Sequence, residues 1–138
     1  MKIQYASDLH LEFHENGSWL KSHPLQVTGD VLVLAGDIGY LGDDNYKSHP
    51  FWDWASENYE QVIVGPGNHE FYKYYDIDTM CDGWDLSVRE NVHCRYNAVI
   101  PLSDVIDLIA TTLWSKIEIY DAYLTEKSVS DFYRIMAS

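Results

Sequence analysis

The fold is decided by the stretch IQYASDLH, residues 3–10, in which a short apolar run passes directly into Asp8 and His10. The same pattern recurs in VLVLAGD at residues 31–37 and in QVIVGPGNHE at residues 61–70. Each apolar run is short, rich in β-branched residues and bounded by turn formers, which is typical of a buried strand in an α/β sheet. Because ligands bind at the carboxyl ends of such strands, we expect one sheet edge to gather all three polar clusters.

Length and charge limit the protein class. The chain has 138 residues, which is enough for one domain and too few for two ordinary ones. Acidic residues outnumber basic residues by 22 to 9, giving a net charge of −13. A surface this acidic repels phosphate backbones and anionic membranes, so long nucleic acids and membranes are disfavoured as partners. The sequence shows neither a signal-peptide pattern nor a membrane-length apolar run, so we expect a cytoplasmic protein with reduced, buried Cys81 and Cys94.

The remaining elements follow from apolar periodicity and turn residues. We expect residues 11–29 to form a long loop with about one helical turn, because no sustained period is present. Apolar residues at helical spacing predict helices, and short β-branched runs without intervening helices predict a second, partly antiparallel sheet. The expected helices are 50–59, 77–90, 116–124 and 131–136, and the expected later strands are 92–96, 98–102 and 105–110.

The polar clusters carry chemistry when they act together. Asp8 and His10 alternate across one residue, so at a strand end they would point the same way and take one metal together. Asn68 can supply a neutral amide oxygen, while His69 and Glu70 offer a proton donor and its orienting partner. Asp8 with His10, and Gly36 with Asp37, are each weak evidence alone, because short motifs often match by chance, whereas the cluster at residues 67–70 is a stronger signal. Their occurrence in this order at three expected strand ends indicates a functional site.

The motifs SDLHLE, GDIG and GNHEFY resemble the first three motifs of the calcineurin-like metallophosphoesterase family. ATTLWS and the later SDFYRI resemble the continuation seen in small bacterial and phage-type members. The resemblance implies an α/β sandwich with a mixed β-sheet, of which this chain would be the N-terminal portion. It also implies that Asp8 and His10 hold a first metal, Asp37 bridges two metals and Asn68 binds the second. By the same resemblance, His69 stabilises the transition state or protonates the leaving oxygen.

The implied activity is hydrolysis of small phosphomonoesters or phosphodiesters. Two divalent ions about 3.5 to 4 Å apart would clamp the attacking and leaving oxygens of an in-line displacement at phosphorus. Mixed oxygen and nitrogen ligands suit manganese, iron or zinc. Specificity would reside in loops such as residues 11–29 and 71–76. Glu12, Phe71 and Tyr72 are candidates to line the substrate pocket, although the two aromatic residues could equally pack on the following helix.

The resemblance is incomplete, because the family adds further histidines later in its domain and this chain has none after His93. We therefore expect a single metallophosphoesterase-like domain over residues 1–138, truncated at its C-terminus, with weak or partial metal occupancy. An uncovered sheet face or edge would favour homo-oligomers or strand exchange. Two functions stay open: a phosphoesterase that is active in a fuller chain or assembly, and a non-catalytic remnant that binds metal or a partner. A nucleotide-binding regulatory module is disfavoured, because no Gly-rich phosphate loop follows any strand.

Overall fold

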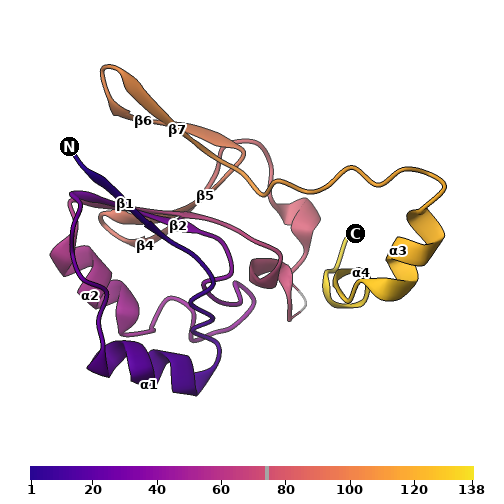
Figure 1. Cartoon of the computed structure of the whole chain (residues 1–138), viewed down its shortest axis with the longest axis horizontal. Helices are drawn as coiled ribbons and strands as arrows, with labels where there is room; N and C mark the ends of the chain where they lie inside the picture. The colour runs from indigo at the N-terminus through magenta and orange to yellow at the C-terminus, as the bar shows by residue number, and fades with distance from the viewer. Residues whose placement is uncertain (74) are drawn as a thin grey trace.

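A mixed five-stranded sheet forms the centre of the molecule, in the order β1-β2-β3-β5-β4 (Figure 1). The computed structural model describes residues 1–73 and 75–138. The strands are β1 (Ile3–Ala6), β2 (Val31–Ala35), β3 (Gln61–Gly65), β4 (Trp84–Arg89) and β5 (Val92–Tyr96). β1, β2, β3 and β5 run parallel, and β4 is antiparallel to β5. This arrangement confirms the predicted α/β fold with a mixed sheet.

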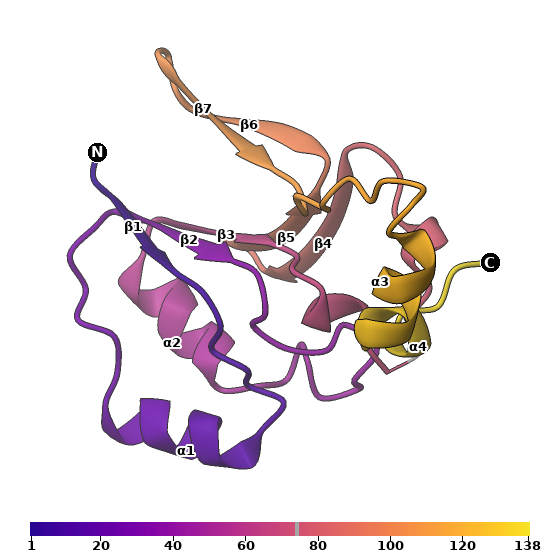
Figure 2. The same ribbon diagram turned by 45° about the vertical axis from the view of Figure 1, so that its right-hand side comes forward.

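The two middle strands are buried because both faces of the sheet are covered. α2 (Phe51–Asn58) packs on one face, where its Trp52 joins a core cluster with Leu32 and Val62. β6 (Ala98–Ser103) and β7 (Ile106–Ala110) form an antiparallel hairpin on the other face, where Ile100 contacts Ile63 (Figure 2). The expected second sheet is therefore present as this hairpin. α1 (His14–Ser22) lies outside α2 and contacts it.

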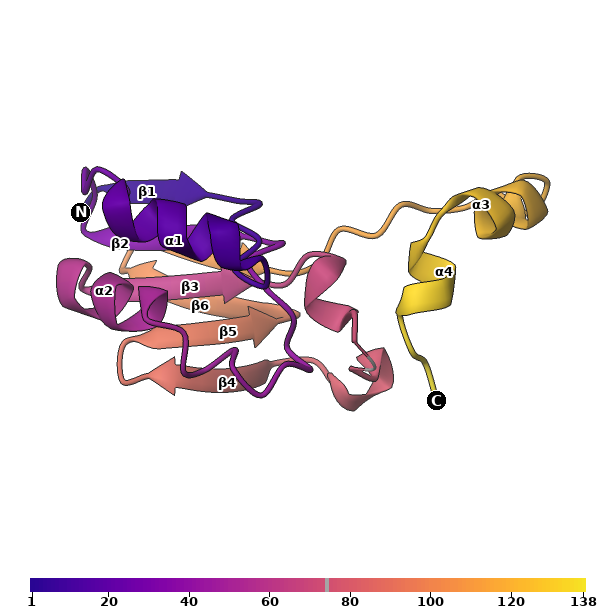
Figure 3. The ribbon, with the colours of Figure 1, turned by 90° about the horizontal axis from the view of Figure 1, so that it is seen from below.

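The C-terminal helices lie beyond the carboxyl ends of the parallel strands (Figure 3). α3 (Ala122–Ser128) and α4 (Asp131–Arg134) follow a long extended connection from β7. Two short 3₁₀ helices, η1 (His69–Phe71) and η2 (Ile77–Thr79), lie near α4, and the Ile77 N–H donates to the Met136 carbonyl at 2.9 Å. In the part of the chain that the structure describes, no helix has the length and apolarity needed to cross a bilayer.

The helix expected over residues 77–90 is wrong in most of its length. Gly83 adopts a left-handed φ of +78°, and residues from Trp84 onward form β4 instead. The apolar residues Trp84, Leu86 and Val88 also repeat with a period of two, and all three pack on the core that α2 shares. Pairing with β5 therefore decides the conformation against the competing helical pattern.

Three further expectations need correction. Residues 14–22 form a nine-residue helix rather than a loop with one turn, and this helix has no buried residue whose periodicity could have revealed it. The expected helix over residues 116–124 begins later, at Ala122, and the one over residues 131–136 ends at Arg134. Both cysteines are free as expected, but only Cys94 is buried, because Cys81 lies in the irregular segment before β4 and is exposed.

Apolar side chains remain exposed on the first strand and on the hairpin. β1 is an edge strand with a partner on one side only, and its Tyr5 is 82% exposed. Val105 and Ile109 of the hairpin are 89% and 70% exposed. Edge strands with apolar side chains offer unpaired backbone groups together with apolar surface to another chain.

Candidate metal centre

Three loops meet at the carboxyl edge of the sheet, one after each of β1, β2 and β3. The first loop runs beside the second, since the Asp8 N–H donates to the Gly36 carbonyl and the His10 N–H to the Asp37 carbonyl, both at 3.0 Å. The second loop touches the third, because a Cβ atom on Gly36 would lie 2.9 Å from the Cα of Gly67. Gly36 itself has a φ of +88°. Glycine at both positions therefore allows the loops to approach this closely.

Left-handed backbone conformations place the candidate ligands. Asp8, His10 and Asp37 have φ values of 56°, 46° and 58°. A non-glycine residue in this region costs about 1–2 kcal/mol, and such strain concentrates at functional sites. Asp8 and His10 lie beyond the end of β1, so the expected strand alternation does not bring them together. The left-handed turns of the loop do so instead.

Asp8, His10 and Asp37 together can hold a divalent cation. One ligand atom from each of them lies within 4.8 Å of the other two. Donors that share one ion at about 2.0–2.2 Å stand at most about 4.4 Å apart, so small side-chain adjustments bring all three into range. Two carboxylates and an imidazole form a donor set that suits manganese, iron or zinc. These residues therefore fit the metal that the sequence resemblance implies.

Asn68 lies at the same edge, with its amide held by the C-terminal segment. The Asn68 Nδ2 donates to the Asp131 carboxylate at 3.0 Å and to the Tyr72 hydroxyl at 3.2 Å. The Tyr72 hydroxyl in turn donates to Asp131. Since both Asn68 bonds use the amide nitrogen, the amide oxygen is the atom that remains for a metal. α4 thus fixes the orientation of Asn68, a role of Asp131 that the sequence reasoning missed.

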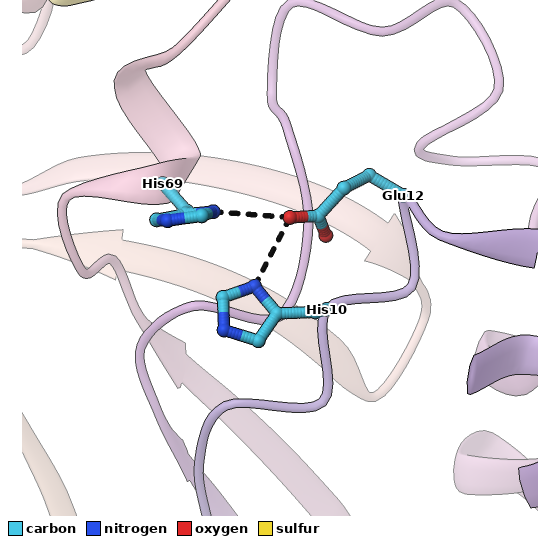
Figure 4. Close-up of side chains that lie close together, drawn as sticks. All are labelled: His10, Glu12 and His69. Atoms are coloured by element: carbon cyan, nitrogen blue, oxygen red, sulfur yellow. Dashed lines mark hydrogen bonds and ion pairs between the residues drawn. The ribbon is translucent and has the colours of Figure 1, made fainter. Parts of the chain in front are cut away.

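His69 is oriented by a residue other than the expected one. Its backbone N–H donates to the Asp37 carboxylate at 3.0 Å, and its ring Nδ1 lies 3.1 Å from the Glu12 Oε1. The same Glu12 oxygen lies 3.0 Å from the Nδ1 of His10, so one carboxylate joins two imidazoles (Figure 4). The expectation that Glu70 orients His69 is therefore wrong.

Glu70 instead binds the backbone of two site loops. Its side chain is fully buried, and it accepts the N–H groups of Asp37 at 2.9 Å, Ile38 at 2.7 Å, Gly39 at 3.3 Å and Gly67 at 2.7 Å. Burial raises the pKa of the Glu70 carboxyl, and these four donors oppose that rise. This carboxylate fixes the loop that carries Asp37 against the loop that carries Asn68.

Two tyrosine rings lie beside the His69 ring. The Tyr72 ring stacks on the His69 ring with centroids 4.5 Å apart, and the Tyr40 ring lies 5.9 Å away. The Arg134 guanidinium lies over the Tyr72 ring, with its Cζ 5.4 Å from the ring centroid. Burial and the charge of Glu12 raise the pKa of Tyr40, which keeps its hydroxyl protonated at neutral pH.

Of the three residues expected to line a substrate pocket, two lie at the candidate site and one lies in the core. Glu12 and Tyr72 both contact His69, so they lie at the site. Phe71 is fully buried and packs against Tyr96 and Trp114, so it belongs to the core. Tyr74, in the expected specificity loop 71–76, lies outside the described residues.

A cavity of about 590 Å³ is lined by residues of α1, α2 and the loops that follow β1 and β2. Glu12 and Tyr40, which both neighbour His69, form part of its wall. Much of the remaining lining is aromatic or aliphatic and includes Leu20, Phe51 and Trp54.

Comparisons with known proteins agree with this geometry. The family described as calcineurin-like phosphoesterase matches residues 1–134. The chain is also 32% identical over 148 residues to "Uncharacterized protein L509" of Acanthamoeba polyphaga mimivirus, covering 96% of this chain and 51% of that protein. It thus spans about half the length of this relative. No solved structure gave a significant match.

Proposed function

The chain belongs to the calcineurin-like phosphoesterase family, and from this we propose that it is a metal-dependent phosphoesterase domain acting at the carboxyl edge of its sheet. The observation that carries the proposal is the convergence of Asp8, His10 and Asp37, whose ligand atoms lie within 4.8 Å of one another. Their left-handed backbones support it further, because unfavourable conformations persist where a function requires them.

We propose that Asp8 and His10 hold a first divalent ion, that Asp37 bridges two ions and that Asn68 binds the second. Manganese, iron and zinc are the candidate metals. When bound, such ions supply Lewis-acid polarisation of the phosphoryl group and positive charge at the attacking and leaving oxygens. The protein contributes the fixed directions of its ligands: Glu70 holds the Asp37 loop, and Asp131 turns the Asn68 amide.

His69 is the proposed catalytic residue. Its ring is 24% exposed, so it can meet a substrate, and Glu12 and Tyr72 limit its orientation. It donates a proton to the leaving oxygen as the bond between phosphorus and that oxygen breaks, or stabilises the charge that develops there. Glu12 accepts from Nδ1, which leaves Nε2 as the atom that faces this task.

A small phosphoester is the proposed substrate class. The net charge of −13 disfavours long nucleic acids, whose backbone it repels. Arg134, which lies over the Tyr72 ring beside His69, provides positive charge close to the site. The cavity between α1 and α2 can accept an apolar leaving group. Because the chain spans about half of its mimiviral relative, full activity is proposed for a longer chain or an assembly that supplies further ligands.

A second candidate function is a non-catalytic module that binds metal through the same residues. The convergence of Asp8, His10 and Asp37 favours it as well, since these three residues can bind a metal whether or not turnover follows. Both candidate functions predict metal binding, but only the phosphoesterase predicts hydrolysis of a substrate.

The test is hydrolysis of an aryl phosphate and an aryl phosphodiester with added Mn²⁺. We expect turnover that is abolished by Asp37→Asn and by His69→Ala, and that is retained by Asp44→Asn, an exposed acidic residue of the neighbouring loop. Turnover that persists in Asp37→Asn and His69→Ala would refute the proposed site. Saturable Mn²⁺ binding without turnover would favour the second candidate.

A further inference from the structure

Glu12 is a nearly buried carboxylate that contacts both histidines of the candidate site. Its side chain is 3% exposed, whereas the His10 and His69 side chains that it contacts are 23% and 24% exposed. Its Oε1 lies 3.0 Å and 3.1 Å from their two Nδ1 atoms, within the range of N–H···O hydrogen bonds. The two imidazoles are the partners of Oε1, whereas Oε2 is buried without a hydrogen-bond partner among the described residues, so the two Nδ1 contacts are what offsets the burial of this carboxylate.

These contacts determine which ring nitrogen carries the hydrogen. An ionised carboxylate can only accept, so each imidazole must donate from Nδ1. In a neutral imidazole the other nitrogen, Nε2, is then an acceptor with a free lone pair. The same oxygen therefore gives His10 and His69 the same tautomer. The rings lie with centroids 4.5 Å apart in an edge-to-face arrangement, so they are also held close to each other.

We propose that Glu12 is the positioning residue of the site, a single carboxylate that fixes the tautomer and direction of the metal ligand His10 and of the catalytic His69. The inference rests on the proposed function and gives a role to Glu12, which is not one of the proposed metal ligands. With Nδ1–H directed to Glu12, the Nε2 lone pair of His10 would serve the metal. His69 would donate to the leaving oxygen from Nε2 of its imidazolium form and return to the neutral Nδ1–H tautomer, so the bond to Glu12 is kept before and after the proton leaves. One oxygen thus couples metal binding to proton transfer.

The sequence context supports a dedicated role for this residue. Glu12 follows His10 by two residues, in the turn that leads into α1. The Asn16 side chain of that helix donates to the Leu9 and His10 carbonyls, both at 3.1 Å, and holds the turn in place. α1, which has no buried residue of its own, therefore anchors the segment that carries Glu12.

The primary test is the histidine tautomer, measured by ¹⁵N NMR of the imidazole nitrogens in the metal-free chain. Signals are assigned with His10→Gln and His69→Gln. We expect the Nδ1–H tautomer for both rings, and Nε2–H as the main tautomer of both would overturn the inference whether or not the protein is an enzyme. Zn²⁺, which is diamagnetic, should leave the Nδ1–H of His10 in place. If the His10 Nδ1–H signal is lost when Zn²⁺ is added, then Nδ1 ligates the metal, and this result would also overturn the inference.

Two substitutions extend the test. Glu12→Ala removes the acceptor and should shift both rings toward Nε2–H, whereas Glu12→Gln keeps an oxygen acceptor and should retain Nδ1–H. Calorimetric Mn²⁺ affinity should fall 10–100-fold in Glu12→Ala, the usual cost of losing a partner of a metal ligand. Glu15→Gln, an exposed change in α1, should leave both readouts unchanged. If Asp37→Asn abolishes Mn²⁺ binding while Glu12→Ala preserves affinity and tautomer, the inference fails and the proposed function stands.

Discussion

Replacement of Glu70 by glutamine should destabilise the whole domain, although the change removes only one charge. The Glu70 Oε2 accepts the N–H groups of Asp37 and Gly67, and its Oε1 accepts those of Ile38 and Gly39. A glutamine keeps one oxygen and places an NH₂ group where the other was, so two N–H groups lose their acceptor and face a donor.

The magnitude follows from the burial of the side chain, which is fully inaccessible to water. A buried donor left unsatisfied costs about 1–3 kcal/mol, so two of them cost about 2–6 kcal/mol. Domains of this size are usually stable by about 5–15 kcal/mol, so Glu70→Gln removes a large share of the free energy of unfolding. The same loss frees the Asp37 loop and should weaken metal binding.

Urea unfolding followed by tryptophan fluorescence measures this cost, because the midpoint falls in proportion to the lost stability. Glu57→Gln is the matched control, since Glu57 is an exposed residue of α2. We expect a much lower midpoint for Glu70→Gln and a change of at most about 0.5 kcal/mol for Glu57→Gln. Equal midpoints for the two variants would refute the argument that the Glu70 carboxylate holds the two loops together.

Three further predictions follow from other parts of the molecule. Gly67→Ala should reduce Mn²⁺ affinity at least tenfold by calorimetry, because the added Cβ would collide with the Asp37 carboxylate; unchanged affinity would contradict the close loop packing. Burial lowers the pKa of His49 below 6.5, and the Phe51 N–H donates to its Nδ1, so the folded state favours neutral His49 and the free energy of unfolding falls as the pH drops below about 6.5. Urea unfolding at a series of pH values around 6.5 should show a smaller loss of stability in His49→Gln than in the wild type, and an equal loss in both would exclude His49 as its cause. We also propose that the exposed edge of β1 supports self-association. Light scattering at micromolar concentration should then report a dimer or larger species for the wild type and a monomer for Tyr5→Lys, whereas a monomeric wild type would contradict the proposal.

The strands that carry the site were predictable because their sequence signals are local. β1, β2 and β3 are apolar runs with polar residues directly after them, and parallel pairing necessarily brings their carboxyl ends together. β4 was not predictable in the same way, since Trp84, Leu86 and Val88 fit both a strand and a helix until β5 supplies a partner. The sequence did not reveal α1, because this helix has no fully buried residue and only its partly buried Leu20 packs against the core, while its Asn16 makes polar contacts with the preceding turn.

The site was predictable in its residue types and only partly in its contacts. Asp8, His10 and Asp37 converge as the motif order suggested, but left-handed turns bring them together and no strand alternation is involved. The contact between Asn68 and Asp131 joins residues 63 positions apart, and no local pattern announces it. Glu12 was predicted as a pocket residue, and its bond to both imidazoles depends on how two loops fold against each other.

Metal uptake by the purified chain tests the central claim most directly. The measurement is calorimetric titration with Mn²⁺, supported by elemental analysis after dialysis, on the wild type, Asp37→Asn and Asp44→Asn. The account predicts saturable binding to the wild type and to Asp44→Asn, and its loss in Asp37→Asn, because Asp37 is one of the three residues whose ligand atoms converge within 4.8 Å. Absence of binding to the wild type, or undiminished binding to Asp37→Asn, would contradict a metal centre at this edge of the sheet.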